Sequence, residues 1–311
     1  MTPKPRSAAL VGTVCYLTCS VFWGLNIPLS STLLKHFDPF WLPMARYVIA
    51  SAMLGAWVAA TLGPRQLRSP IPLTRVAALS AMVSGFLLLF NLGLLYTHPV
   101  TAAAVIAGSP VYVAVVMRTM TGVRLAPGFW TATALTLIGA GIAVHGRAEA
   151  IGSGFRLQGG EPALIGSIAC WTVYSILAQR WFRPDVPQLR RTWLTSLGAI
   201  PWLLAVWGAA RAAGLAPAPN LSPDAGTLAS LVVSAVVCTA LATVAWNTGV
   251  ARLGIAAGGM WQNTIPVFAV LISLVGYGVV PTASQVLGGA VVLAGVAWMQ
   301  RRSLRAAAAP A

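Results

Sequence analysis

Long apolar stretches alternate with short polar breaks along most of the chain. Ten of the stretches reach about 20 residues, the length that an α-helix needs to cross the hydrocarbon core of a bilayer. The breaks carry Pro, Gly or charge, as in Gly63-Pro64-Arg65. The pattern therefore predicts an all-α integral membrane protein with ten transmembrane helices. The predicted spans are 10–34, 40–62, 74–96, 99–118, 128–145, 162–181, 191–213, 227–249, 254–276 and 282–300.

Two other interpretations of the apolar stretches fit less well. The strands of a transmembrane β-barrel are shorter and alternate apolar with polar residues, whereas these stretches are long, continuous and rich in Ala and Leu. The stretch 10–34 is too long for the apolar region of a signal peptide and lacks a convincing cleavage site. We expect it to remain in the protein as the first span.

Composition excludes several other classes of protein. Charged residues make up only 8% of the chain and hydrophobic residues 58%, whereas soluble proteins carry roughly 25% charged residues. A net charge of +15 suggests nucleic-acid binding only where basic residues gather on one polar face, and here they are scattered between the apolar stretches. We therefore predict a lipid bilayer, and no nucleic acid, as a partner.

The positions of Lys and Arg predict the orientation in the membrane. With the N-terminus in the cytoplasm, 15 of the 20 Lys and Arg residues fall on the cytoplasmic side, four fall outside, and Arg46 remains within a span. Cytoplasmic loops carry such an excess of basic residues. We expect a multi-pass protein of the cell inner (cytoplasmic) membrane with both termini cytoplasmic. The four outer residues are Lys35, Arg147, Arg156 and Arg211.

The two halves of the chain repeat each other at a shift of 156 residues. The matched pairs are Asn91 with Asn247, Gly93 with Gly249, Pro110-Val111 with Pro266-Val267, Gly122-Val123 with Gly278-Val279, and Gly139 with Gly295. We predict two five-helix repeats, residues 10–145 and 162–300, inverted in the membrane because five is an odd number. Inverted repeats are typical of transporters whose halves exchange roles; a duplication kept only for packing is the alternative.

Several motifs lie in an order and at a spacing that resemble one family. They are Phe22-Trp23-Gly24, Lys35, Pro39 and Arg46; Leu94-Leu95-Tyr96-Thr97 and Pro110-Val111-Tyr112; then Ala169-Cys170-Trp171, Pro266-Val267-Phe268 and Gly288…Gly295. Over nearly the whole chain they resemble the EamA type of the drug/metabolite transporter superfamily. The resemblance implies a cavity between the halves, lined by spans 1, 3, 4, 6, 8 and 9, with spans 5 and 10 outside them. Among these proteins the chain resembles most the exporters of amino acids and metabolites, in particular aromatic amino acids.

The chain departs from the family where Glu commonly follows Gly, because these two positions read Gly122-Val123 and Gly278-Val279. No Asp or Glu lies inside a predicted span, although proton and ion relays in membranes usually use such residues. His36, His98 and His145 fall at predicted outer helix ends, where an interfacial position is the alternative to a proton site. We predict transport without a strict proton or sodium requirement.

Polar side chains inside the spans are candidates for substrate binding, because each needs a partner away from water. Arg46 lies about two turns inside its span. It is suited to a substrate carboxylate through two parallel hydrogen bonds; the alternative is that it snorkels to the interface or caps a neighbouring helix. The other candidates are Asn26, Asn91, Asn247, Gln262 and Asn263.

Aromatic residues are the second group of candidates, because aromatic walls suit flat apolar solutes and cations. Four tryptophans are predicted deep in the spans beside Gly or polar residues, and five other rings are weaker candidates; helix packing is the alternative for each. The tryptophans are Trp23, Trp171, Trp246 and Trp261, and the other rings are Tyr47, Phe86, Phe90, Tyr112 and Tyr174.

Spans 4 and 9 each contain a proline in their interior, and the sequence has no catalytic or nucleotide-binding motif. Pro110 and Pro266 interrupt helix hydrogen bonding inside their spans, and we predict them as matched hinges for two gates. No ATP-binding, metal or nucleophile motif is found, and the four cysteines form no Cys-x-x-Cys, so we expect no cofactor and no metal. We therefore predict a monomeric secondary exporter of amino acids or related metabolites, working by alternating access. The alternatives are a drug or nucleotide-derivative carrier of the same fold and, in another class, an intramembrane lipid-modifying enzyme.

Overall fold

The computed structural model describes residues 5–122, 125, 128–150 and 156–308, which form helices and their connections with no strand among them. The predictions for three residues, Lys4, Val123 and Arg124, lie outside the described residues. So do the side chains of Arg6, Arg147, Glu149 and Arg305.

Most ends of the observed helices lie within four residues of the predicted span ends, but the first helix begins five residues earlier, and the helices of the fifth and tenth spans end five and eight residues later. Three of the spans are divided into parts. The uninterrupted helices are α1 (Pro5–Leu33), α2 (Trp41–Leu62), α3 (Leu73–Leu95), α6 (Phe129–Ala150), α7 (Glu161–Trp181), α8 (Gln188–Ala212) and α13 (Ala283–Ala308). The divided spans are α4 (Pro99–Ala107) with α5 (Ser109–Thr121), α9 (Ala225–Val233) with η2 (Ser234–Leu241) and α10 (Ala242–Leu253), and α11 (Ile255–Gln262) with α12 (Ile265–Tyr277). A short helix, η1 (Pro64–Leu67), follows α2.

The described helices have the length and hydropathy of a multi-pass membrane protein. Nine helical runs are long and apolar enough to cross a bilayer, and the bent pair of α4 and α5 makes a tenth if it counts as one span. The prediction of an all-helical chain is therefore confirmed for the described residues, with nine or ten candidate membrane spans.

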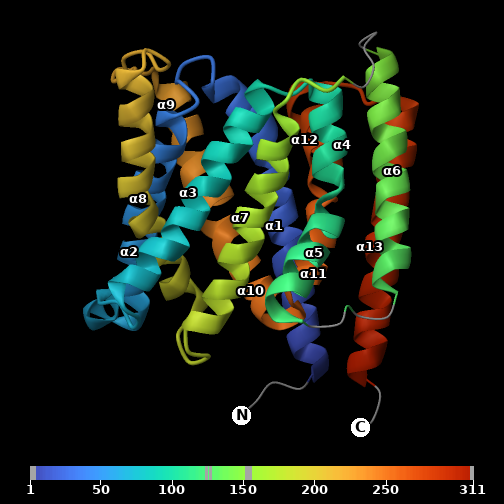
Figure 1. Cartoon of the computed structure of the whole chain (residues 1–311), viewed down its shortest axis with the longest axis horizontal. Helices are drawn as coiled ribbons and strands as arrows, with labels where there is room; N and C mark the ends of the chain where they lie inside the picture. Colours follow the sequence, from blue (N-terminus) through green and yellow to red (C-terminus); the bar gives the residue numbers. More distant parts are fainter. Residues whose placement is uncertain (1–4, 123–124, 126–127, 151–155, 309–311) are drawn as a thin grey trace.

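The helices stand side by side (Figure 1). α2, α8 and α9 lie at one edge of the bundle and α6 and α13 at the other. Between these edges, α3 packs against α7 and α8, and α1 packs against α10 and α12. α6 and α13 pack mainly on each other, so spans 5 and 10 lie outside the central helices, as the resemblance implied.

Two of the spans are broken at places that lie 156 positions apart. α4 and α5 meet at an angle of 45° around Gly108, and two residues, Asn263 and Thr264, separate α11 from α12. Pro110 and Pro266 lie in the first turns of α5 and α12. Backbone N–H groups in a first turn make no hydrogen bond within the helix, so a proline there removes none. The predicted hinge prolines therefore begin new helices.

The same two helices end alike. A shift of 156 residues carries α5 onto α12 from end to end. Each stops at a glycine in the left-handed region, with φ 67° at Gly122 and 66° at Gly278, a conformation that side chains with a Cβ rarely adopt. The first residue of each Gly-Val pair is thus a helix terminator.

One irregular segment has no counterpart in the predictions. Ser234–Leu241 is a π-helix inserted between α9 and α10, and the Thr239 hydroxyl donates to the Ser234 carbonyl across its wider turn, at 3.0 Å. π-helical turns are rare and are frequent at functional sites. This one packs against α1 and α2.

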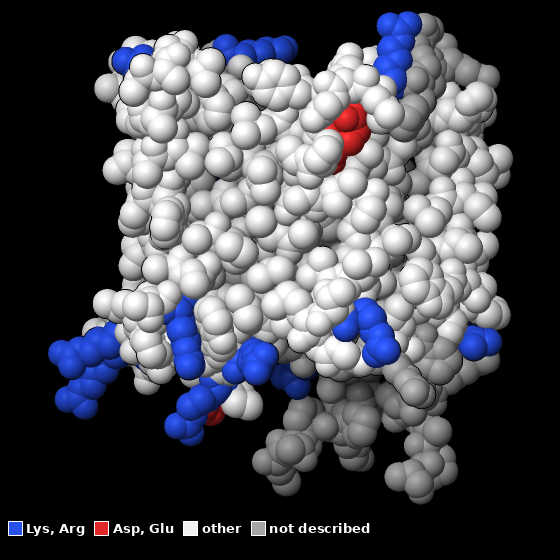
Figure 2. Space-filling model, viewed as in Figure 1, with Lys and Arg blue, Asp and Glu red and all other residues white. Residues whose placement is uncertain are grey.

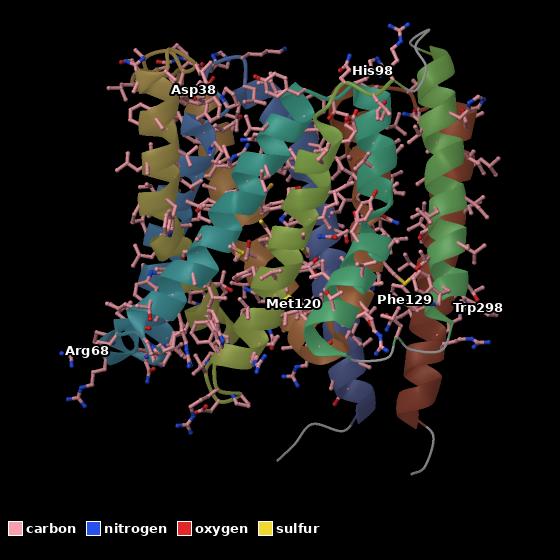
Figure 3. The ribbon with its side chains drawn as sticks, in the orientation of Figure 1. Asp38, Arg68, His98, Met120, Phe129 and Trp298 are labelled. Atoms are coloured by element: carbon pink, nitrogen blue, oxygen red, sulfur yellow. The ribbon has the colours of Figure 1, made fainter. Side chains whose placement is uncertain are left out.

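Basic side chains mark one end of the bundle (Figure 2). We call this the basic end; α1 begins and α13 ends there (Figure 1). Arg68 lies at the basic end, whereas Asp38 and His98 lie at the opposite end (Figure 3). The described basic residues at helix ends on this side are Arg65, Arg68, Arg75, Arg118, Arg180, Arg183, Arg190, Arg191, Arg252, Arg301 and Arg302.

The prediction of spans without acids needs one correction. The sequence pattern begins the sixth span at residue 162, but α7 and its candidate span begin at Glu161. The two carboxylate oxygens of Glu161 accept hydrogen bonds from the backbone N–H groups of Gln158 and Gly159, each at 2.9 Å. The Glu161 side chain therefore binds the turn that precedes α7, and the helix begins at Glu161, one residue before the predicted start.

Candidate functional site

Seven aromatic side chains from four helices form a continuous cluster, with Trp171 at its centre halfway along α7. The ring of Trp171 lies 5.1 Å from Phe86, 5.2 Å from Tyr174, 5.6 Å from Trp23 and 5.8 Å from Trp246 between ring centres. These separations are typical of favourable aromatic pairs. We call Tyr16, Trp23, Phe86, Phe90, Trp171, Tyr174 and Trp246 the aromatic cluster.

The aromatic cluster has a buried side and an accessible edge. Trp171 and Trp246 are almost fully buried, with 4% and 2% of their surface exposed. Trp23 on α1 and Phe86 and Phe90 on α3 are only half-buried. α1 and α3 therefore carry the partly exposed rings of the cluster, and α7 and α10 carry its buried tryptophans.

A buried polar network holds the α10 side of the cluster. The amide nitrogen of Asn247 donates to the hydroxyls of Tyr174, at 2.9 Å, and Thr192, at 2.8 Å. The Trp246 indole N–H donates to the hydroxyl of Ser175 at 3.1 Å. Leaving a buried polar group without its partner costs about 1–3 kcal/mol, so these bonds fix α10 against α7 and α8.

One face of α1 connects the aromatic cluster with Arg46. Tyr16, Trp23 and Ser30 are seven residues apart, so they lie on one face of the helix. Ser30 accepts a hydrogen bond from the Arg46 guanidinium at 2.7 Å. Seven residues of helix rise by about 10 Å, so Ser30, which binds the guanidinium, lies about two turns along α1 from Trp23.

The guanidinium of Arg46 is only partly satisfied. Its Nε is buried and has no hydrogen-bond partner among the described residues. Asn26, one turn before Ser30 on α1, accepts a hydrogen bond from Ser234 at the start of the π-helix, at 2.8 Å. A cation, an amide and an irregular helix thus meet at the half of the bundle away from the basic end, and this arrangement is suited to a carboxylate.

The two broken spans cross where they break. The Asn263 amide, between α11 and α12, donates at 3.2 Å to the carbonyl of Ala107, the last residue of α4. These two residues are separated by 156 positions, the repeat shift. The break of one span is therefore hydrogen-bonded directly to the break of the other.

The two sides of this crossing differ. On the basic side α5 and α11 pack together so closely that a Cβ added to Gly259 would lie 3.2 Å from the Cβ of Val113. On the other side no comparable packing joins α4 to α12 in the described part of the chain. The crossing is closed toward the basic end.

Two parts of the chain, residues 10–144 and 158–301, match the model of the EamA-like transporter family. The chain belongs to the EamA-like transporter family. It is accordingly a multi-pass membrane transporter, and the aromatic cluster and the crossing of its broken helices lie within the matched residues.

Curated relatives of this EamA-type protein are also transporters by name. Over 91% of this chain and 91% of each relative, it is 24% identical to the uncharacterized transporter YyaM of Bacillus subtilis and 26% identical to a probable terminal-alkyne amino-acid exporter of Streptantibioticus cattleyicolor. An uncharacterized transporter of Archaeoglobus fulgidus is 25% identical over 85% of the chain and 88% of the relative. A solved crystal structure with the same fold has a TM-score of 0.75 at 20% identity, covering 95% of this chain and 98% of that one.

The structure brings most of the predicted site residues of this EamA-type protein together but leaves some apart. Asn91, the repeat mate of Asn247, donates instead to the Pro39 carbonyl at 2.8 Å, near the end of α3 away from the basic end. Trp261 is buried in the same core as Trp171, and Gln262 is half-buried at the end of α11. Tyr47 is buried in that core and Tyr112 packs on it, as expected for packing side chains.

Sequence reasoning missed Tyr16, which is fully buried. Its hydroxyl donates to the Gly254 carbonyl at 2.8 Å, and its ring meets the edge of Trp246 at 5.5 Å. The signal that would have found it is the spacing of seven residues to Trp23. Thr192 was missed as well, although Thr192, Thr195 and Ser196 form a polar stripe at helical spacing in α8.

Proposed function

We propose that this transporter exports amino acids, with aromatic and other hydrophobic ones as its preferred substrates, by alternating access across the cell inner membrane. The two five-helix halves, 10–145 and 162–300, act as inverted repeats, and the basic end faces the cytoplasm. Pro110 and Pro266 begin the segments that move.

The observation that carries the proposal is the asymmetric crossing of the two broken spans. Ala107 and Asn263 lie 156 positions apart and are hydrogen-bonded to each other; among the described helices α5 packs closely on α11 on the basic side, whereas α4 and α12 do not pack comparably on the other. Two halves related by an in-plane axis can exchange these two states. The exchange opens the basic side and closes the other, and so carries a substrate across.

The substrate class is inferred from two neighbouring features. The accessible rings of Trp23, Phe86 and Phe90 suit an apolar or aromatic side chain, and the partly satisfied guanidinium of Arg46 suits a carboxylate. The printed name of the Streptantibioticus relative, a probable terminal-alkyne amino-acid exporter, is of the same class.

A first test is counterflow in proteoliposomes that hold only this protein. We expect labelled phenylalanine, tryptophan and leucine to exchange faster than in protein-free vesicles. Trp23→Ala should reduce the rate by about tenfold, because it removes a ring contact worth about 0.5–1.5 kcal/mol beyond its buried area. Trp298→Ala is the matched control, since that ring is 44% exposed on α13. Exchange of drugs or nucleotide derivatives, with no exchange of amino acids, would contradict the substrate class.

Arg46 provides a second test. A hydrogen bond to a charged group contributes about 1.5–3 kcal/mol, so Arg46→Gln is expected to raise the half-saturating concentration of phenylalanine about tenfold or more. Arg46→Lys should have an intermediate effect because it keeps the charge and loses the planar fork. Arg156→Gln removes an exposed charge from the same half and is the control. Equal loss of transport for phenethylamine, which has no carboxylate, would show that Arg46 is structural.

The energetic coupling is a third prediction. Within the described spans the single acid, Glu161, already uses both oxygens as acceptors of backbone hydrogen bonds. An ion couples to transport only if its binding favours one conformation over another, and a capping carboxylate is poorly placed for that. We expect net efflux and counterflow of a zwitterionic amino acid to be insensitive to imposed pH, sodium and voltage gradients. Uphill accumulation driven by a pH or sodium gradient would refute this.

A further inference from the structure

A groove opens at the basic end, where α5, α7 and α11 come together. It has a volume of about 470 Å³ and is lined by Met120, Thr121, Ile176, Gln179, Arg180 and Ile255. Figure 3 shows Met120 at this end of α5. Three of the lining side chains are apolar, and Gln179 and Arg180 supply amide and cationic groups.

Arg180 is the charged group of this groove. It lies in the last turn of α7, is exposed, and has no hydrogen bond or ion pair to another described residue. Gln179 by contrast accepts a bond of 3.5 Å from Arg191. A free guanidinium beside the apolar Met120, Ile176 and Ile255 is complementary to a small molecule with a carboxylate at one end and an apolar group at the other.

The groove and the aromatic cluster lie along one face of α7. Trp171, Ser175 and Gln179 are four residues apart, so one face of α7 joins the cluster to the groove. Between them lies the contact of Val113 with Gly259, where α5 and α11 are packed shut. Ile255 is one turn from Gly259 on the groove side. The groove is therefore the space directly outside the closed crossing.

We propose that this groove is a recruitment site at the basic end, in which Arg180 binds the carboxylate of an amphipathic amino acid while Met120, Ile176 and Ile255 cover its side chain. The proposal rests on the proposed function, because the occupant is the molecule to be exported. Arg180 binds the carboxylate on the basic side before the crossing opens, and Arg46 binds it on the other side of the crossing.

The test measures occupancy of the groove separately from transport. In a variant whose four cysteines are replaced by alanine, Thr121→Cys places a thiol in the groove, and inverted vesicles expose it to a membrane-impermeant thiol reagent. Phenylalanine and leucine are expected to slow the modification, whereas phenethylamine is not. Arg180→Gln should raise the phenylalanine concentration needed for half-protection about tenfold or more, as for other hydrogen bonds to a charged group. Arg180→Lys should raise it less.

Arg183→Gln is the matched control. Arg183 is three residues away and 80% exposed, and its side chain pairs with Asp185 outside the groove. Its loss should leave protection unchanged. The proposal would be overturned if phenylalanine and phenethylamine protected equally, if Arg180→Gln left protection unchanged, or if neither amino acid protected. It would also be overturned if the thiol were protected only when the vesicles contain anionic lipid. Protection without flux would instead contradict the proposed function and leave the groove site standing.

Discussion

Replacing Gly139 with leucine is expected to destabilise the protein severely. Gly139 lies in a close contact between α6 and α13, and a Cβ at this position would come within 2.6 Å of the Gly288 carbonyl oxygen and 2.7 Å of the Val292 nitrogen. Both obstacles are backbone atoms, so no rotamer change relieves the clash. Overpacking costs about 1–3 kcal/mol where side chains can adjust, and here the helices themselves must separate.

The measurement is thermal unfolding in detergent together with the size-exclusion profile. We expect Gly139→Leu to lower the unfolding midpoint and the monodisperse yield. Gly141→Leu is the matched control, because that glycine lies on the same helix, is exposed, and its added Cβ would have no described atom within 4 Å apart from the backbone of its own helix. Equal stability of the two leucine variants would contradict the observed packing of α6 on α13.

The spans could be predicted because they depend on local sequence. A helix that crosses a bilayer must have a certain length and hydropathy. Both properties can be seen in the sequence of a stretch such as 74–96, which corresponds to α3 in the structure. The breaks were visible too, since Pro110 and Pro266 cannot lie in a helix interior without loss of a hydrogen bond. The sequence left open whether each proline bends a helix or begins one.

The aromatic cluster was partly predictable for a similar reason. The small or polar neighbours of Trp23, Trp171 and Trp246 predict deep positions for them, and the structure brings all three together. Asn91 shows the limit. Its repeat mate Asn247 is buried in a network, whereas Asn91 meets the Pro39 carbonyl in a connection between helices. Which partner an amide finds depends on distant chain segments that its own sequence does not specify.

The π-helix and the groove were not predictable for different physical reasons. The stretch Ser234–Leu241 has the composition of an ordinary apolar helix, and its extra residue per turn is accommodated by tertiary packing on α1 and α2. The groove exists only because three helix ends converge. Arg180 looked like one more basic residue of the positive-inside pattern, and its lack of a partner is visible only in three dimensions.

The second large effect is expected from locking the crossing of the broken helices. A Cβ on Gly259 would lie 3.2 Å from the Cβ of Val113, and the two Cβ atoms of a disulfide lie about 3.8 Å apart on average. Val113→Cys with Gly259→Cys should therefore form a disulfide after a displacement of a few tenths of an ångström, since the smaller cysteine also relieves the contact. The bond would hold α5 against α11 and keep the basic side shut.

The central claim is that substrate crosses only when this contact opens, and counterflow of the double-cysteine variant tests it most directly. The four native cysteines are replaced by alanine, cross-linking is verified by mass spectrometry, and each single-cysteine variant is oxidised in parallel as a control. We predict that counterflow of phenylalanine falls to the level of protein-free vesicles when the disulfide forms and returns when it is reduced, while the single variants are unaffected by oxidation. Undiminished counterflow with the disulfide fully formed would contradict alternating access through the crossing of α5 and α11.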